Sequence, residues 1–141
     1  LVLIGSSPRY EFSEDEWVDG TGRVLDRLTA LAGNVLIIAG TPSLPFDGPG
    51  CLSQSVAPGE CSRIIKDPLS DDVARLLTVA TQRYDNAATI NLSDLVCPDR
   101  FCSAISNDGI IVYRDTQHIT DRFARSRAAA IRERLAATGN F

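Results

Sequence analysis

The feature that most restricts the fold is the run Val35–Ala39 (VLIIA), which is apolar at every position. A strand with one face in water alternates apolar and polar residues, whereas a parallel strand covered by helices on both faces is apolar throughout. Leu1–Ile4 (LVLI) has the same character and ends at Gly5. Both runs therefore predict buried strands of a parallel sheet.

Amphipathic segments follow these two strands. Ser13 and Glu16 have the spacing of a capping box and predict the start of a helix that ends near Gly33. Ser70 is the expected cap of a second helix, and Thr120 precedes a third. The predicted inward faces are Trp17, Thr21, Val24, Leu28 and Leu31 in the first helix, Val73, Leu76, Leu77, Ala80 and Tyr84 in the second, and Phe123 or Ala124, Ala128, Ile131 and Leu135 in the third.

The remaining segments complete the order of elements. Ala87–Leu92 predicts a third strand, and Asn107-Asp108-Gly109 is a strong turn signal that predicts a small hairpin. Residues 40 to 69 are rich in Pro, Gly and Ser without periodicity and predict a long loop. Strand, helix, strand, helix, strand, hairpin and helix together predict a single domain over residues 1–141, with a three-layer α/β/α fold and a parallel sheet.

Four cysteines form two local pairs in segments typical of loops: Cys51 with Cys61, and Cys97 with Cys102. Zinc binding and free buried thiols are the alternatives, but neither pair has the two-residue gap of a usual zinc knuckle. Two disulfides are therefore favoured, and no metal is expected. Disulfides persist in oxidising compartments, so the domain is expected to be extracytoplasmic.

Charge and hydropathy exclude two classes of function. The net charge of −4 argues against nucleic acid, which requires a basic face to neutralise phosphates. The arginines after Thr120 are interleaved with Asp121 and Glu133, which favours a solvated helix face over an anion or lipid patch. The longest apolar run is far below the roughly 20 residues that cross a bilayer.

The absence of methionine and the apolar first residues lead us to expect a piece of a longer protein.

The candidate catalytic residues are Asp115 and His118, the latter the only histidine. They follow the apolar run Ile110–Tyr113 and precede the last helix, so a loop at the end of a strand should present them. An aspartate beside a histidine can fix the imidazole tautomer and stabilise the imidazolium. The alternative is that His118 merely bonds a helix cap.

These residues resemble the end of an SGNH-type (GDSL-like) hydrolase domain, specifically the domain fused to the membrane-embedded acyltransferase-3 domain of bacterial glycan O-acyltransferases. The resemblance rests on the Asp115-x-x-His118 motif entering the last helix, on the Cys-x4-Cys loop with the hairpin that follows it, on the Thr41-Pro42 exit from a strand, and on the stretch Asp94–Cys97. It extends from residue 1 to about residue 137. It implies a flavodoxin-like fold in which Asp115 orients His118, and His118 acts as the general base.

The chain departs from this family at the nucleophile, because no Gly-Asp-Ser block occurs. Gly5-Ser6-Ser7 is the nearest sequence and would make Ser7 the nucleophile, but Pro8 follows at once. We prefer to align residues 1–10 with a later strand and loop, which in simpler relatives contributes an oxyanion-hole asparagine. Ser6, Ser7 and Arg9 are then the expected substitute donors, and the nucleophile is expected upstream, so that this chain alone should be inactive.

The resemblance implies an extracytoplasmic acyl-transfer domain that moves an acyl group, expected to be acetyl, onto a cell-surface glycan hydroxyl. The expected partners are an acyl donor, a glycan acceptor and a membrane acyltransferase domain in the parent chain, which would be anchored in the cell membrane. No cofactor is expected. The alternatives are a secreted carbohydrate esterase of the same fold, which passes the acyl group to water, and a non-catalytic glycan-binding domain with a decayed triad.

Overall fold

A computed structural model describes residues 1–54, 57–66 and 69–139. Three parallel strands form the main sheet in the order β1 (Val2–Gly5), β2 (Val35–Ile38) and β4 (Ala87–Ile90). Val35 of β2 pairs with Val2 on one side and with Ala87 on the other. The predicted parallel sheet is confirmed, and β1 forms one of its edges.

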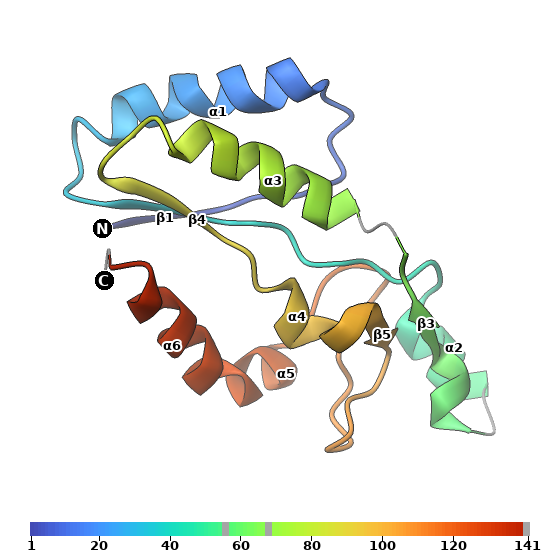
Figure 1. Ribbon diagram of the computed structural model, residues 1–141. Coiled ribbons are helices and arrows are strands. Elements are labelled where there is room, and N and C mark those ends of the chain that lie inside the picture. The colour runs from blue at the N-terminus through green and yellow to red at the C-terminus, as the bar shows by residue number, and fades with distance from the viewer. Residues whose placement is uncertain (55–56, 67–68, 140–141) are drawn as a thin grey trace.

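Helices α1 (Glu14–Leu28) and α3 (Leu69–Thr81) cover one face of this sheet, while α5 (Asp121–Ser126) and α6 (Ala128–Ala137) lie on its other side (Figure 1). The predicted capping box at α1 is present, because Ser13 and Glu16 bond each other's backbone N–H groups. The first core lies between sheet and helices, and the predicted stripe of α3 is confirmed at Val73, Leu76, Leu77 and Ala80.

The predicted inward face of α1 is only partly right. Leu25 is fully buried, whereas Val24 is exposed and Leu31, beyond the helix, is 85% exposed. The helix is turned so that Gly22 is buried, and the hydroxyl of Tyr84, which follows α3, donates to the Gly22 carbonyl oxygen at 3.0 Å. A Cβ at Gly22 would lie 3.7 Å from this hydroxyl, an ordinary van der Waals contact, so the hydrogen bond rather than the glycine fixes the two segments.

Residues 40–69 were predicted as a long loop, and this prediction is wrong for much of the segment. It contains α2 (Gly48–Gln54), the 3₁₀-helix η1 (Pro58–Cys61) and β3 (Ser62–Ile64). Strand β3 pairs antiparallel with β5 (Phe101–Ser103), so a partner far along the chain supplies the order that local periodicity lacks. Short elements α4 (Ser93–Val96) and η2 (Pro98–Arg100) precede β5.

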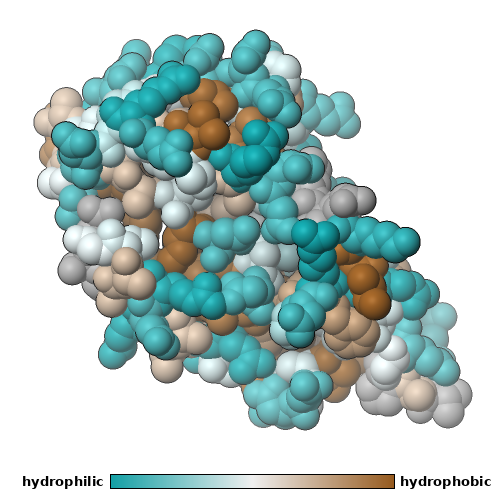
Figure 2. All heavy atoms as spheres, viewed as in Figure 1, coloured by the Kyte–Doolittle hydropathy of each residue, from teal (hydrophilic) through white to brown (hydrophobic). Residues whose placement is uncertain are grey.

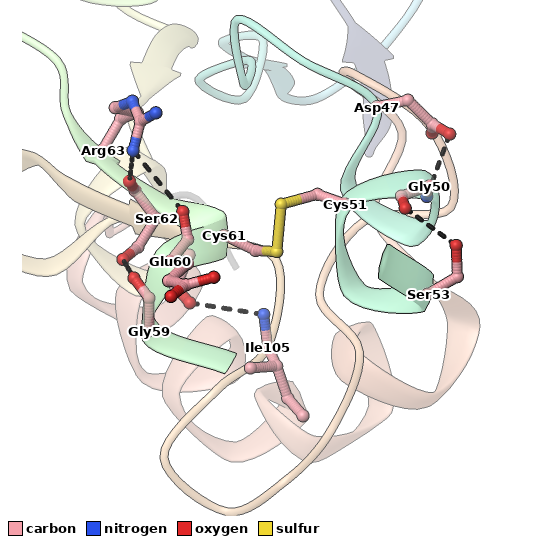
Figure 3. The surroundings of a disulfide bond; sticks show 11 residues. Asp47, Gly50, Cys51, Ser53, Gly59, Glu60, Cys61, Ser62, Arg63 and Ile105 are labelled. Atoms are coloured by element: carbon pink, nitrogen blue, oxygen red, sulfur yellow. Dashed lines mark hydrogen bonds between the residues drawn. A yellow bond between two sulfur atoms is a disulfide. The ribbon is translucent and has the colours of Figure 1, made fainter. Parts of the chain in front are cut away.

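Both predicted disulfides are confirmed: Cys51 is bonded to Cys61, and Cys97 to Cys102. The first joins α2 to the end of η1 (Figure 3). Around it, the Asp47 carboxylate accepts a bond from the Gly50 N–H, and Arg63 donates to the Ser62 carbonyl. The disulfide and these local bonds together order a segment whose sequence shows no periodicity.

A second core lies outside the sheet, around the disulfides and α5. Its largest fully buried side chains are Tyr113 and Phe123, and they pack with Cys61, Cys97, Cys102 and Val112. The predicted hairpin turn is present, since the Ser106 N–H donates to the Ile110 carbonyl and Gly109 has a φ of 74°. Glycine is favoured at such a positive φ.

Two helix predictions need correction: the cap at Ser70 and the single last helix. Ser70 lies inside α3, which begins at Leu69, and its buried hydroxyl has no partner among the described residues. Thr120 does cap α5 by accepting the Phe123 N–H, but the single predicted last helix breaks at Arg127 into α5 and α6. No described side chain of α6 is fully buried. Ile131 and Leu135, which belong to the predicted inward face, are half-buried.

Most residues on the face shown in Figure 2 are hydrophilic, and the hydrophobic ones gather in a few patches. Within the described part of the chain, none of the helices combines the length and the apolar character that a membrane crossing needs.

Removing the first disulfide should test how far it stabilises the second core. The double variant Cys51→Ser/Cys61→Ser should lose about 2–3 kcal/mol in free energy of unfolding, because the cross-link restricts the unfolded chain. Urea denaturation measures this loss. The variant Cys97→Ser/Cys102→Ser is the matched comparison, with the shorter loop of 5 residues against 10. A larger loss in the comparison variant would contradict the chain-entropy explanation.

Candidate active site

Asp115 and His118 lie on a tight loop closed at its base by backbone pairing. Tyr113 and Ile119 form an antiparallel bridge, and the Arg114 N–H donates to the His118 carbonyl at 2.9 Å. The buried Tyr113 fixes one end of this loop to the second core, and Thr120, the cap of α5, fixes the other. The loop is thus held at both ends.

Within the loop, the Asp115 carboxylate is held by three bonds. Its Oδ1 accepts the backbone N–H groups of Gln117 at 2.8 Å and His118 at 2.7 Å. Its Oδ2 lies 2.7 Å from Nδ1 of His118. The backbone N–H of His118, then that of Gln117, and then the imidazole hold the pKa of Asp115 well below its usual range.

The pair faces solvent, because 53% of the His118 side chain and 45% of the Asp115 side chain are exposed. With Asp115 ionised, Nδ1 carries the proton and donates it to Oδ2, which leaves Nε2 of the neutral ring as an acceptor. Among the described residues, none bonds Nε2. The pair therefore has an oriented imidazole with an accessible nitrogen, and the expected contact between the two side chains is present.

The exit from β2 fastens this loop to the carboxyl end of the sheet. The Thr41 hydroxyl donates to the Gln117 carbonyl at 3.3 Å, and the Leu44 N–H donates to the Thr116 carbonyl at 2.8 Å. The buried Tyr113 hydroxyl donates to the carbonyl of Pro42 at 3.0 Å. These bonds place the Asp115–His118 pair beside the end of β2, where α/β folds present reactive groups.

Arg9 also reaches this loop, from the segment after β1. Its Nη1 donates to Oε1 of Gln117 at 2.9 Å. Gly40 makes the approach possible, because a Cβ at this position would lie 2.2 Å from Cδ of Pro8 and 3.0 Å from the Ser6 carbonyl oxygen. The structure thus brings one of the expected donors next to the Asp115–His118 pair.

The other two expected donors lie in a different place. Ser6 and Ser7 line a cavity of about 540 Å³ beside α1. In the described part of the chain, neither serine hydroxyl bonds to Asp115 or His118. Ser7 is therefore not held as a nucleophile against the imidazole in this structure.

Gln117 is a residue that sequence reasoning missed. Its backbone N–H holds Asp115, its carbonyl accepts from Thr41, and its side chain accepts from Arg9. Its position between the aspartate and the histidine was the only available signal, and nothing in its type indicates three contacts. The described residues contain no group of three or more histidine, cysteine or acidic side chains that could hold a metal ion.

The chain is thus a parallel α/β domain with an aspartate–histidine pair at the carboxyl end of its strands. The model of the family "SGNH domain (fused to AT3 domains)" matches residues 2–133, and the chain belongs to this family. The description of this family records a fusion to acyltransferase-3 domains, which suggests an acyl-transfer or esterase-like domain. No curated protein and no solved structure matches the chain.

The contact at Gly40 can be tested by one added methyl group. Gly40→Ala should lower the free energy of unfolding by roughly 1–3 kcal/mol, because the methyl group overlaps Pro8 and the backbone of Ser6. It should also separate Arg9 from Gln117, which the chemical shifts of the two side chains would report. Gly33→Ala is the matched control, because a Cβ there meets nothing within 4 Å. Equal stability of the two variants would contradict the close packing.

The bonds to Asp115 predict how its charge responds to acid. The carboxyl should remain ionised below about pH 3.9, the usual value for an unfolded aspartate, because its folded-state pKa is lower. The ionised form therefore stabilises the fold above the unfolded pKa, and this contribution is lost as the pH falls toward the folded-state pKa. Carboxyl carbon shifts between pH 6 and 2 measure the titration. A midpoint at the usual aspartate value would contradict the described bonds.

Proposed function

We propose that residues 1–141 are the C-terminal part of an extracytoplasmic acyl-transfer domain, which moves an acetyl-sized acyl group onto a hydroxyl of a cell-surface glycan. Asp115 and His118 supply the acid and base of a Ser-His-Asp mechanism. The observation that carries this proposal is the 2.7 Å contact between Oδ2 and Nδ1, in a loop at the carboxyl end of a parallel sheet. Family membership supports the acyl-transfer chemistry, and the fusion in the family description supports a membrane-anchored parent.

The mechanism assigns one role to each member of the pair. Nε2 of His118 takes the proton from a serine hydroxyl as Oγ attacks the carbonyl carbon of the acyl donor. The imidazolium then protonates the departing group of the donor, and an acyl-serine remains. In the second half, Nε2 takes the proton from a glycan hydroxyl, which attacks the acyl carbon, and the serine oxygen recovers a proton. Asp115 stays ionised and stabilises the imidazolium in both halves.

The nucleophile in this proposal comes from a segment outside residues 1–141. Two observations support this view: the described residues place no serine against Nε2, and the outer edge of β1 carries no strand partner among them. Leu3 of that strand is 50% exposed, although parallel strands are ordinarily covered on both faces. A further strand would pair with this free edge of β1 and stand near the loop that carries Arg9.

Arg9 is the proposed anion-stabilising donor. Its guanidinium bonds the neutral amide of Gln117, and within the described part of the chain no carboxylate pairs with it. It can therefore offer its remaining N–H groups to the oxygen that becomes negative when the acyl carbon is attacked. Ser6 and Ser7 remain candidates for this role only after a movement of their loop. The disulfides support an oxidising compartment and so an extracytoplasmic location.

The catalytic proposal is tested by adding the parent protein's sequence that precedes Leu1 and measuring hydrolysis of p-nitrophenyl acetate. The longer protein should turn the ester over, and His118→Ala should reduce the rate by about 10²–10⁴, the usual contribution of a general base. Asp115→Asn should also reduce it, because the tautomer is no longer fixed. Ser7→Ala should largely spare it.

Asp121→Asn is the control for the carboxylate, because Asp121 is an exposed aspartate that pairs with Arg125 in α5. Its rate should match that of the unchanged protein. Robust turnover by residues 1–141 alone, lost in Ser7→Ala, would make Ser7 the nucleophile and overturn the proposed origin of the serine. An inactive longer protein with a correctly formed Asp115–His118 pair would favour the non-catalytic glycan-binding alternative.

A further inference from the structure

The cavity beside α1 is formed by the end of β1, the segment that follows it and one face of α1. Its floor is apolar and includes Ile4, Ile37 and Leu77. Its volume of about 540 Å³ lies within the range of small-molecule sites. The same segment continues to Arg9, which bonds Gln117 beside His118. The cavity is therefore connected to the catalytic loop through a short stretch of backbone.

Aromatic rings form one wall of this cavity. The rings of Tyr10 and Phe12 are stacked, with centroids 5.4 Å apart and planes inclined by 14°. Phe12 meets Trp17 edge to face, with centroids 5.3 Å apart. Tyr10 is 60% exposed and Phe12 is 51% exposed, so these two rings present apolar faces to water. An exposed aromatic patch at the rim of a cavity offers a ligand flat apolar surfaces for stacking.

Hydroxyl groups form the other wall. Ser6, Ser7 and Thr21 are half-buried and line the cavity. Within the described part of the chain, none of their side-chain oxygens has a hydrogen-bond partner. A half-buried hydroxyl needs a partner from water or from a ligand. Three such groups opposite aromatic faces suit a ligand that has both apolar faces and many hydroxyls.

Charge narrows the chemistry of the ligand further. Among the described residues that line the cavity, Glu16 is the only one with a charged side chain. The Ser13 N–H and hydroxyl donate to its carboxylate at 2.8 and 2.9 Å. These bonds lower the pKa of Glu16, so it remains a charged acceptor. A fixed carboxylate repels phosphates and acids but accepts bonds from neutral hydroxyls. The cavity is therefore unsuited to an anionic ligand.

We infer that the cavity beside α1 binds a neutral pyranose unit of the acceptor glycan, stacked on Tyr10 and Phe12 and bonded by the hydroxyls of Ser6, Ser7 and Thr21. The C–H face of a pyranose ring packs on an aromatic ring, while its equatorial hydroxyls reach the polar wall. This inference rests on the proposed function and deepens it by locating the acceptor. Arg9 would then link the bound sugar to the position of His118.

Trp17 provides a specific readout, because it is the only tryptophan in the sequence and it lines the cavity. Residues 1–141 are titrated with cellotetraose, β-1,4-galactotetraose and β-1,4-mannotetraose, while tryptophan emission and saturation-transfer NMR of the sugar protons are recorded. At least one sugar should give a saturable response in the millimolar range or tighter. Tyr10→Ala/Phe12→Ala should weaken it at least tenfold, and Thr21→Val, which keeps the shape, should weaken it about threefold.

Phe101→Ala is the matched control, because Phe101 is an exposed phenylalanine outside this cavity, in β5. Its binding should equal that of the unchanged protein. The inference is overturned if none of the three sugars responds, or if the response survives in Tyr10→Ala/Phe12→Ala. It is also overturned if decanoate alone gives the response, which would indicate an acyl-chain site, or if residues preceding Leu1 abolish binding by filling the cavity.

His118→Ala separates this inference from the proposed function. The variant should bind the sugar normally, because the imidazole is not part of the cavity lining. Sugar binding without any ester turnover in the longer protein would remove the catalytic proposal alone. Ester turnover without sugar binding would remove this inference alone.

Discussion

The structure depends on the connection between the exit of β2 and the loop that carries Asp115 and His118. The protein has two separate cores, one between the sheet and the helices α1 and α3, the other around the disulfides and α5. Hydrogen bonds from the exit of β2 help to join them: Thr41 to Gln117, and Tyr113 to Pro42. Because the last of these is buried, leaving its carbonyl acceptor unpaired would cost about 1–3 kcal/mol. The candidate active site therefore lies at the junction of the two cores.

This position explains how an exposed aspartate–histidine contact can have a defined geometry. Exposed salt bridges usually contribute little, because two flexible side chains must be ordered in water. Asp115 avoids most of this cost, because two backbone N–H groups of its own loop fix the carboxylate before the imidazole binds. The loop itself is fixed by Tyr113 and Thr120. Orientation of His118 thus comes from backbone geometry and from the second core, rather than from burial of the pair.

The sequence predicted those parts of the structure whose causes are local. The uniformly apolar strands, the capping box at Ser13, the turn at Gly109, both disulfides and the Asp115–His118 contact all follow from residues near one another in the chain. Order in residues 40–69 depends on pairing of β3 with β5, which no local pattern indicates. The orientation of α1 depends on the contact between Gly22 and Tyr84, and the roles of Gln117 depend on three segments meeting. These arrangements arise only when distant elements pack together.

Some contacts of the candidate site form within one loop, whereas others need distant segments to meet. This difference matters if the serine of the proposed triad comes from another segment. The base half is complete within Asp115–His118, because every bond that orients Asp115 comes from its own loop. Such a pair does not need the nucleophile in order to form, so a serine from another segment would meet a base that is already oriented. Preorganisation of this kind reduces the entropy lost when the site is completed. The proposed anion donor differs, because Arg9 reaches the loop through the close approach at Gly40. The segment after β1, which also forms a wall of the cavity beside α1, therefore carries both the proposed anion donor and part of the proposed acceptor site.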